Sequence, residues 1–581
     1  MNPWKLSLEK WIYILAFAVG LLLRFLKLGA APLSDYEAGW ALQALKLSQG
    51  SLQIAGSQPG YISLTGSLFR LFESSNFLAR FWPAILGSIL VLCPFLFRNL
   101  LGRRPALLLA FFLACDPALT AASRQADGRM LALVFTLLSL GMLVQGSSLF
   151  AGIFAGIALL GGPFIWEITL VLAIAAAWQR WIKLSRAVDK EIFEREGRPV
   201  FFGNGSAFLA GIVLSLLTVG TLFMLFPGAL SATAQSLPEY FSEWVAPHSA
   251  STINDGVVAD HSYLKIVAAL FTGELFFLIF GGWMALKTTI YQSAIPVFLA
   301  RWLAVSLLIV FLYPARQPVD LALVTVPLLA LTAVQIDKMF TGQVEDSTAA
   351  WGTGLAFAVL LIFAFINLAG LTDITVTGLD SQVRLLSLVG AVALAILITL
   401  LVAWGWSVKS ALSGSTSALV LLLAIFTFSS VWKAASLGHH PSTELWRLGS
   451  EPSGFNLLLN SIENTSRKAR VDRHSLDIQI LGLDSPALKW ALRDFRNVSV
   501  VNAIPADAQP ALILSDNLQE AAWGAAYTGQ DFVLNMQPTW GLMKFEEWLR
   551  WSIFREAPLD QELLVMWVRS DLFPGGTDAV N

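Results

Sequence analysis

Long apolar runs follow one another along most of this chain, from its first residues to about Trp432. A membrane-spanning helix needs about 20 mostly apolar residues, and about thirteen runs approach that length. The pattern therefore predicts a polytopic α-helical membrane protein. The expected spans are roughly residues 11–28, 80–100, 105–123, 129–146, 149–162, 164–181, 206–226, 265–286, 296–313, 320–336, 350–370, 385–405 and 416–432.

The pattern changes after Trp432, where short apolar segments alternate with polar ones. LDIQILGL at 476–483 predicts a buried strand, and SPALKWALRDF at 485–495 predicts a helix with a Ser cap and an early Pro. VSVVNA, ALILS and FVLNM repeat the strand pattern, and FEEWLRWSIF at 545–554 repeats the helical one. We expect a membrane domain at 1–432 and a small soluble α/β domain at 433–581.

The composition agrees with a bilayer setting. Of the 581 residues, 56% are hydrophobic and only 13% are charged, and the mean hydropathy is +0.66. The net charge of -2 offers no clustered Lys/Arg field, which excludes a nucleic-acid partner. Cys93 and Cys115 both fall in apolar segments, so we interpret them as small buried hydrophobes and predict no disulfide framework.

Basic residues in the loops predict the orientation, because cytoplasmic loops are rich in Lys and Arg. We place the N-terminus in the cytoplasm of a cell-membrane protein. The first apolar run lacks a small-residue cleavage site and is expected to remain as a span. The loop after it, the segment 227–264 and the soluble domain then lie outside the cytoplasm. The basic residues assigned to the cytoplasmic side are Arg98, Arg103, Arg104, Arg180, Lys183, Arg186, Lys190, Arg195, Arg198, Lys287, Lys338 and Lys409.

Two carboxylates, Asp35 and Glu37, follow the first span in the sequence APLSDYEAGWALQALKLSQG. The apolar spacing of residues 38–47 predicts a helix lying along the membrane interface. Asp35 and Glu37 point the same way if the backbone at 35–37 is extended, and diverge if it is helical. The alternative to a chemical role is that both acids cap this helix.

A second charged segment, SRQADGRM at 123–130, lies between the third and fourth expected spans, on the same side as Asp35. Ionisable residues at this depth are costly to bury, so they usually face a cavity or one another. Arg124, Asp127 and Arg129 are therefore candidate site residues. The alternative is a short loop whose charges pair locally.

The order of these features resembles the GT-C superfamily of membrane glycosyltransferases, of the protein O-mannosyltransferase and aminoarabinose transferase type. The resemblance covers roughly the first 340 residues and is one of pattern. It rests on Arg24 near the end of the first span, the acidic motif with Asp35 and Glu37, and LARFWPAILGSILVL at 78–92. SRQADGRM and the Arg-bearing loop that opens YPARQPVDLALVTVPLLALTA at 313–333 complete it.

The resemblance implies an inverting transfer of a sugar from a polyprenyl-phosphate donor to a hydroxyl acceptor at the outer membrane face. Such a reaction needs one carboxylate as general base, and Asp35 is the first choice. Glu37 and Asp127 are the other catalytic candidates. Tyr36 splits the Asp-Glu pair that is usually adjacent in the family, so the role of Glu37 stays open.

The leaving lipid phosphate calls for arginines, whose planar fork binds phosphate oxygens at two points. Arg124 and Arg316 are the leading candidates, followed by Arg80 and Arg24. For Arg80 and Arg24 the alternative is that their side chains extend to the membrane interface without a ligand.

The outer loop at 236–265 carries His248 and His261, candidates for acceptor or sugar contacts together with Tyr36 and Tyr61. The alternatives are a solvated lid and an aromatic belt. A divalent metal is a further alternative, but no tight ligand spacing is present and no metal ligand is assigned. The expected partners are a polyprenyl-phosphate sugar, a lipid, glycan or protein acceptor, and membrane lipids.

Two other functions compete with sugar transfer. The span count allows a transporter or lipid flippase, yet the sequence shows neither paired repeats nor matching interrupted spans. A non-catalytic GT-C-like scaffold, with the outer domain binding a partner protein or cell-wall glycan, is the second alternative, and the split acidic motif leaves it open.

Overall fold

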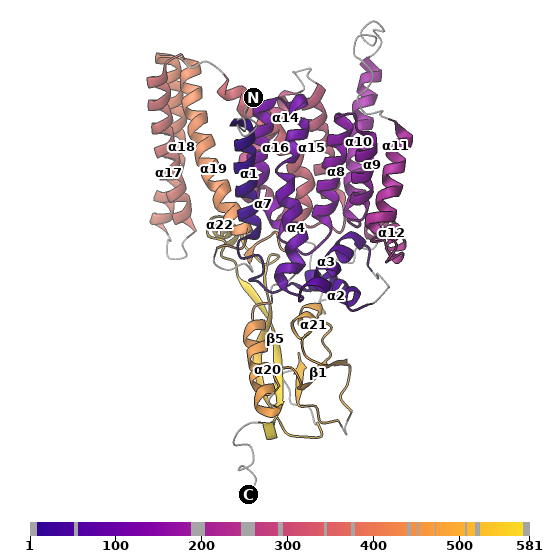
Figure 1. Cartoon of the computed structure of the whole chain (residues 1–581). Coiled ribbons are helices and arrows are strands. Elements are labelled where there is room, and N and C mark those ends of the chain that lie inside the picture. The colour runs from indigo at the N-terminus through magenta and orange to yellow at the C-terminus, as the bar shows by residue number, and fades with distance from the viewer. Residues whose placement is uncertain are drawn as a thin grey trace.

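The computed structural model describes residues 8–50, 56–186, 204–245, 262–288, 294–341, 345–372, 378–438, 443–449, 452–470, 472–505, 508–516 and 523–572. Most of these residues form a bundle of membrane helices, and a smaller domain containing a sheet extends from one end of it (Figure 1). A multi-pass membrane protein with a C-terminal α/β domain is thereby confirmed as the fold class.

The membrane domain contains nineteen α-helices within the described ranges. They are α1 (Leu8–Phe25), α2 (Asp35–Ser48), α3 (Pro59–Leu71), α4 (Asn76–Leu90), α5 (Arg98–Leu101), α6 (Arg103–Ala114), α7 (Pro117–Ser123), α8 (Arg129–Val144), α9 (Ser148–Leu159), α10 (Phe164–Arg186), α11 (Gly205–Ser215), α12 (Gly228–Val245), α13 (Ser262–Gly273), α14 (Leu275–Lys287), α15 (Ala294–Leu312), α16 (Ala322–Phe340), α17 (Ser347–Leu371), α18 (Leu379–Gly405) and α19 (Val408–Ala434).

The expected count of about thirteen spans is not confirmed. By length and composition, six helices of the described residues can cross a membrane, or up to eight if two bent pairs each count as one span. Runs such as 129–146 and 149–162 do form helices, but α8 has 16 residues and α9 only 12, which is short for a bilayer crossing. Hydropathy detects apolar runs and does not by itself separate full crossings from shorter buried helices.

Two of the apolar spans are interrupted, contrary to the sequence-based expectation. Helices α6 and α7 bend by 56° at their junction, and α13 and α14 bend by 91°. The first break falls at Cys115 and Asp116, just before Pro117, whose ring is accepted at the start of a helix but not inside one. The second break falls at Glu274, which separates α13 from α14.

Helix α16 forms the centre of the bundle. In its most apolar 18-residue stretch, 94% of the residues are buried, whereas the corresponding share is 11% in α17 and in α18. Its close neighbour is α14, where a Cβ on Gly281 would lie 2.6 Å from the Leu328 carbonyl oxygen, so only glycine permits this approach. Helices α17 to α19 stand to one side of the bundle (Figure 1). Their exposed apolar side chains fit a lipid environment.

The short helices α2 and α3 lie at the end of the bundle opposite the N-terminus of α1, next to the C-terminal domain (Figure 1). That domain contains α20 (Phe455–Arg470), β1 (Asp477–Leu481), α21 (Pro486–Ala491), β2 (Asn497–Val501), β3 (Leu512–Ser515), β4 (Tyr527–Pro538), α22 (Phe545–Phe554) and β5 (Leu559–Arg569).

The five strands form one mixed sheet in the order β2-β1-β3-β5-β4. Strands β2, β1 and β3 are parallel, while β5 is antiparallel to both β3 and β4. Strand β3 is buried at all four positions, as its continuous apolar sequence predicts. Strand β5 was not expected from the sequence, because the first half of LDQELLVMWVR is mostly polar and is exposed in the structure.

Candidate functional site

Helix α2 fixes the directions of the acidic motif. Ser34 is its N-cap and forms a capping box with Glu37, so residues 35–37 are helical. In a helix, successive side chains point about 100° apart. Asp35, Tyr36 and Glu37 therefore face three different surroundings, as expected for the helical alternative.

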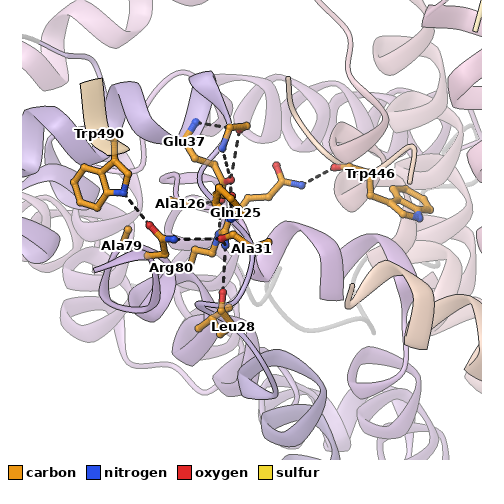
Figure 2. Close-up of polar contacts among 12 residues, drawn as sticks. Leu28, Ala31, Glu37, Ala79, Arg80, Gln125, Ala126, Trp446 and Trp490 are labelled. Atoms are coloured by element: carbon orange, nitrogen blue, oxygen red, sulfur yellow. Dashed lines mark hydrogen bonds and ion pairs between the residues drawn. The ribbon is translucent and has the colours of Figure 1, made fainter. Parts of the chain in front are cut away.

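Glu37 forms a buried two-point ion pair with Arg80 of α4 (Figure 2). Arg80 Nη2 lies 2.6 Å from Glu37 Oε2, and Nε lies 2.7 Å from Oε1. Burial alone would raise the pKa of Glu37, but the charge and hydrogen bonds of Arg80 outweigh it and hold this pKa below its usual value. Arg80 also donates to the carbonyl oxygens of Leu28, Ala31 and Pro32, so it does not extend to the membrane interface.

Two more arginines lie near this end of the bundle, Arg124 of the second charged segment and Arg24 of α1. Arg124 Nη1 donates to the carbonyl oxygens of Leu23, Arg24 and Leu26, where α1 ends. Arg24 itself is fully buried and donates to Leu113 and Ala114 at the end of α6. Arg24 therefore stabilises the break between α6 and α7 and does not reach the surface.

A cavity of about 460 Å³ lies where α1, α2, α7 and α19 meet the linker to the C-terminal domain. Its walls carry four cations, Lys27, Arg80, Arg124 and Arg447, and among the described lining residues Glu37 is the one acid. Burial, together with the nearby charges of Arg80, Arg447 and Arg24, lowers the pKa of Arg124 to about 10. Such mutual repulsion between cations favours binding of an anion in the cavity.

A second cluster surrounds Arg129, at the start of α8. Its guanidinium lies 3.5 Å from Asp127 and 3.5 Å from Asp320, the latter in the 3-10 turn Pro318–Leu321 that precedes α16. The Tyr36 ring lies 5.7 Å from this guanidinium. Glu167 of α10 is buried nearby and interacts electrostatically with Asp320 and Arg129. Three acids thus share one neighbouring arginine.

Asp127 is the acid of this cluster best suited to proton transfer. It is 2% exposed, and burial raises its pKa to about 6, against the opposing effect of Arg129. Its Oδ1 accepts the backbone N–H of Arg129 at 3.0 Å. A carboxylate with a pKa near neutrality can both accept and release a proton under physiological conditions.

One short loop, residues 124–128, connects the cavity and the cluster. Arg124 and Gln125 line the cavity, and Asp127 belongs to the cluster. The loop is held by Glu37, which accepts the N–H of Ala126, and by Gln58, which accepts the N–H of Gly128. Gln125 in turn donates to the Trp446 carbonyl oxygen in the linker, as Figure 2 shows.

Asp35 faces the C-terminal domain. Its Oδ1 accepts the Ser485 hydroxyl at 2.6 Å and the Ala487 N–H at 2.9 Å, at the start of α21. Trp490 of the same helix donates to the Asn76 side chain at 2.8 Å (Figure 2). Asp35 is thus part of the contact that joins the two domains.

The remaining candidates neither line the cavity nor pair directly with Arg129 in the described residues. The Arg316 guanidinium lies 3.4 Å from the centre of the Tyr263 ring and donates to the Tyr313 carbonyl oxygen. Tyr61 is buried and donates to the Ala79 carbonyl oxygen. His248 and His261 lie outside the described residues. Arg129 thus joins Asp127 to Asp320, which lies in the same loop as Arg316. Asp35 is not part of this group, because it contacts α21.

Four residues of these sites were not singled out from the sequence: Lys27, Arg447, Glu167 and Asp320. Glu167 carried a usable signal, because it is an isolated acid in an apolar run. Lys27 and Arg447 belong to connecting segments, and only the fold brings them together.

A metal centre finds no support in the part of the chain that the structure describes. No three His, Cys, Asp or Glu side chains are grouped there so as to hold an ion. Asp127 and Asp320 instead pair with Arg129, whose positive charge occupies the place between them.

The chain matches no protein-family model, and no curated protein sequence matches it. It does match solved structures. ArnT from Cupriavidus metallidurans in the apo state aligns with a TM-score of 0.51 and 16% identity, over 88% of this chain and 93% of that one. The same ArnT bound to undecaprenyl phosphate gives a TM-score of 0.48 and 14% identity over the same shares.

An oligosaccharyltransferase from Archaeoglobus fulgidus, in complex with Zn and sulfate, gives a TM-score of 0.37 and 11% identity. The match covers 84% of this chain and 62% of that one. The alignment with apo ArnT, which extends over most of both chains, shows that this chain shares the fold of that protein.

Proposed function

We propose that this protein transfers a sugar from a polyprenyl-phosphate donor to a hydroxyl acceptor, at the membrane face from which the C-terminal domain extends. One observation carries the proposal: the loop 124–128 joins a cation-lined cavity to a buried carboxylate whose pKa is close to neutral. The cavity suits a phosphate, and the carboxylate suits the removal of a proton.

In this reaction the acceptor oxygen attacks the anomeric carbon while the bond from that carbon to the phosphate oxygen breaks. The hydroxyl proton passes to Asp127, and the electron pair of the broken bond stays on the lipid phosphate. Lys27, Arg124 and Arg447 stabilise the added negative charge in the cavity. Arg80 is held by Glu37 and contributes through its electric field.

A single base is sufficient for a transfer that inverts the anomeric configuration, since no covalent sugar-enzyme intermediate forms. We assign this role to Asp127 in preference to Asp35, because Asp35 already accepts two hydrogen bonds from α21. Glu37 is assigned a positioning role through Arg80 and Ala126.

The fold supports a lipid-linked donor, because the ArnT that shares it also has a structure bound to undecaprenyl phosphate. The basic loops support the orientation proposed above, with the N-terminus in the cytoplasm and the C-terminal domain outside. A divalent metal stays an alternative from the sequence alone, and no metal ligand is assigned.

The test is release of free polyprenyl phosphate from a panel of polyprenyl-phosphate sugars by the full chain in lipid vesicles. We expect release that depends on an added hydroxyl acceptor and that is lost in Asp127→Asn. Asp531→Asn, at an exposed position of β4, serves as the control. Equal release by wild type and Asp127→Asn would contradict the assignment of the base, and no release from any donor would contradict the proposed function.

A non-catalytic scaffold is the second candidate, and a specific observation favours it. Both carboxylates of the acidic motif, Asp35 and Glu37, are engaged in contacts that hold the structure together. A scaffold is expected to bind polyprenyl phosphate or its partner without turnover, so the release assay separates the two functions.

A further inference from the structure

The two interrupted spans meet inside the bundle, and each carries an acid at its break. Asp116 lies between α6 and α7, and Glu274 lies between α13 and α14. Both side chains are completely buried. Neither acid belongs to the cavity or to the cluster around Arg129 described above.

The geometry directs the two carboxyl groups at each other. Asp116 Oδ1 accepts the Leu119 N–H at 2.7 Å, and Glu274 Oε1 accepts the Ala118 N–H at 3.4 Å. Because these two N–H groups belong to consecutive residues of α7, the two carboxyl groups lie side by side. The second oxygens, Asp116 Oδ2 and Glu274 Oε2, find no donor among the described residues.

A contact of this kind requires a proton. Two ionised carboxylates have only acceptors and repel each other, and in a water-excluded bundle both effects are costly. One proton between the two groups supplies the missing donor and removes one of the two negative charges. A proton bound in this way satisfies the orphaned oxygens without any other ligand.

The charged and titratable groups that face the pair are Arg24 of α1 and Cys115. Arg24 donates to the carbonyl oxygens of Leu113 and Ala114, directly before Asp116. One proton on the pair leaves a single negative charge, which Arg24 balances. Loss of that proton would leave an uncompensated charge in the interior of the helix bundle.

We propose that Asp116 and Glu274 form a proton-binding carboxyl pair that holds the two interrupted spans together. The site binds one exchangeable proton, and its loss pushes the two breaks apart. Helix α7 lies between its N-cap Asp116 and its C-cap Arg124, and Arg124 lines the cavity. A change in the protonation state of the pair therefore shifts the cavity wall through one short helix.

Infrared difference spectroscopy of the full chain in lipid vesicles tests this proposal. We expect a carbonyl band of a protonated carboxyl group at neutral pH in the wild type, sensitive to exchange into heavy water. In Glu274→Gln, Asp116 faces Arg24 alone and ionises, so the wild-type minus Glu274→Gln difference spectrum shows the loss of a protonated-carboxyl band. The bands of other buried acids, such as Glu167, cancel in this difference. Glu345→Gln, an exposed acid paired with Lys409, is the matched control and keeps the band.

Three outcomes would overturn the proposal. The first is the absence of a protonated carboxyl band at neutral pH in the wild type. The second is a wild-type minus Asp116→Asn/Glu274→Gln difference spectrum that contains no protonated-carboxyl band. The third is a band that Na⁺ removes at constant pH while K⁺ does not, which would identify a metal ion as the occupant. Glu274→Gln keeps the shape of the side chain, so it tests the pair even if Asp116→Asn does not fold.

Discussion

Asp35 of α2 accepts hydrogen bonds from Ser485 and from the backbone of α21, 450 and 452 residues away along the chain. An acid that the sequence presents as a general base thereby joins the membrane domain to the C-terminal domain. The contact lies directly beside the cavity, because Ser34 and Gly449 both line that cavity. Docking of the C-terminal domain and the shape of the cavity are therefore linked.

Loss of this contact is expected to loosen the domain junction. Asp35→Asn removes a charged acceptor of two hydrogen bonds, each worth about 1.5 to 3 kcal/mol when buried and less at this half-buried position. Limited proteolysis of the C-terminal domain measures the effect, with Ser485→Ala as the partner in a double-mutant cycle. Additive effects of the two changes would show that the hydrogen bond does not contribute.

The activities of the Asp35→Asn and Asp127→Asn variants show which of the two carboxylates is the base. If Asp127 is the base, Asp35→Asn retains more activity than Asp127→Asn, because it alters docking and leaves proton transfer intact. The measurement is the initial rate of lipid phosphate release at saturating donor. The reverse order of the two variants would restore Asp35 as the base.

The ion pair of Glu37 and Arg80 is expected to stabilise the fold strongly. Glu37→Gln leaves Arg80 buried at 3% exposure without its charge partner, at a cost of about 3 to 5 kcal/mol. Thermal unfolding in detergent measures the loss, and Glu546→Gln on the exposed side of α22 is the control. Replacing both residues with apolar ones should recover part of the stability, and no difference between Glu37→Gln and the control would contradict this role.

The raised pKa of Asp127 predicts two opposite pH effects. Activity requires the carboxylate, so the rate should increase as pH rises through about 6. Stability should change the other way. Burial favours the protonated form, so the contribution of Asp127 is fully present below its unfolded pKa of about 3.9 and is lost as pH rises through about 6.

Both pH effects are checked in the same samples, by rate profiles and by thermal unfolding between acidic and neutral pH. Asp127→Asn should remove this part of the pH dependence of unfolding. A rate that is flat through this range in the wild type would exclude Asp127 as the titrating base.

The sequence predicted the helices and strands better than the breaks between helices and the pairing of the last strand. Apolar runs and turn residues identified the helical membrane domain, four of the five strands, and helices α21 and α22. Pro117 and Glu274 lie inside runs whose average hydropathy is still that of a membrane span, so hydropathy did not reveal the two breaks. Strand β5 was missed because its polar half pairs with β4 beyond the buried part of the sheet.

The candidate site was predictable only in part, because contacts between distant segments depend on the fold. Arg124, Asp127 and Arg80 carry charge in apolar surroundings, and that cost is visible in the sequence. The directions of Asp35, Tyr36 and Glu37 depend on whether the backbone is helical, which the sequence left open. Lys27 and Arg447 are 420 positions apart in the chain and join only through the docking of the linker.

Binding of undecaprenyl phosphate to the full chain in lipid nanodiscs shows whether the phosphate occupies the cavity. We expect saturable binding that weakens by about tenfold or more in Arg447→Gln and in Lys27→Gln, since each removes a charge-assisted contact to the phosphate. Arg316→Ala should weaken it less, and Arg467→Ala on the exposed side of α20 should have no effect. Equal affinity in all of these variants would show that the phosphate does not occupy the cavity.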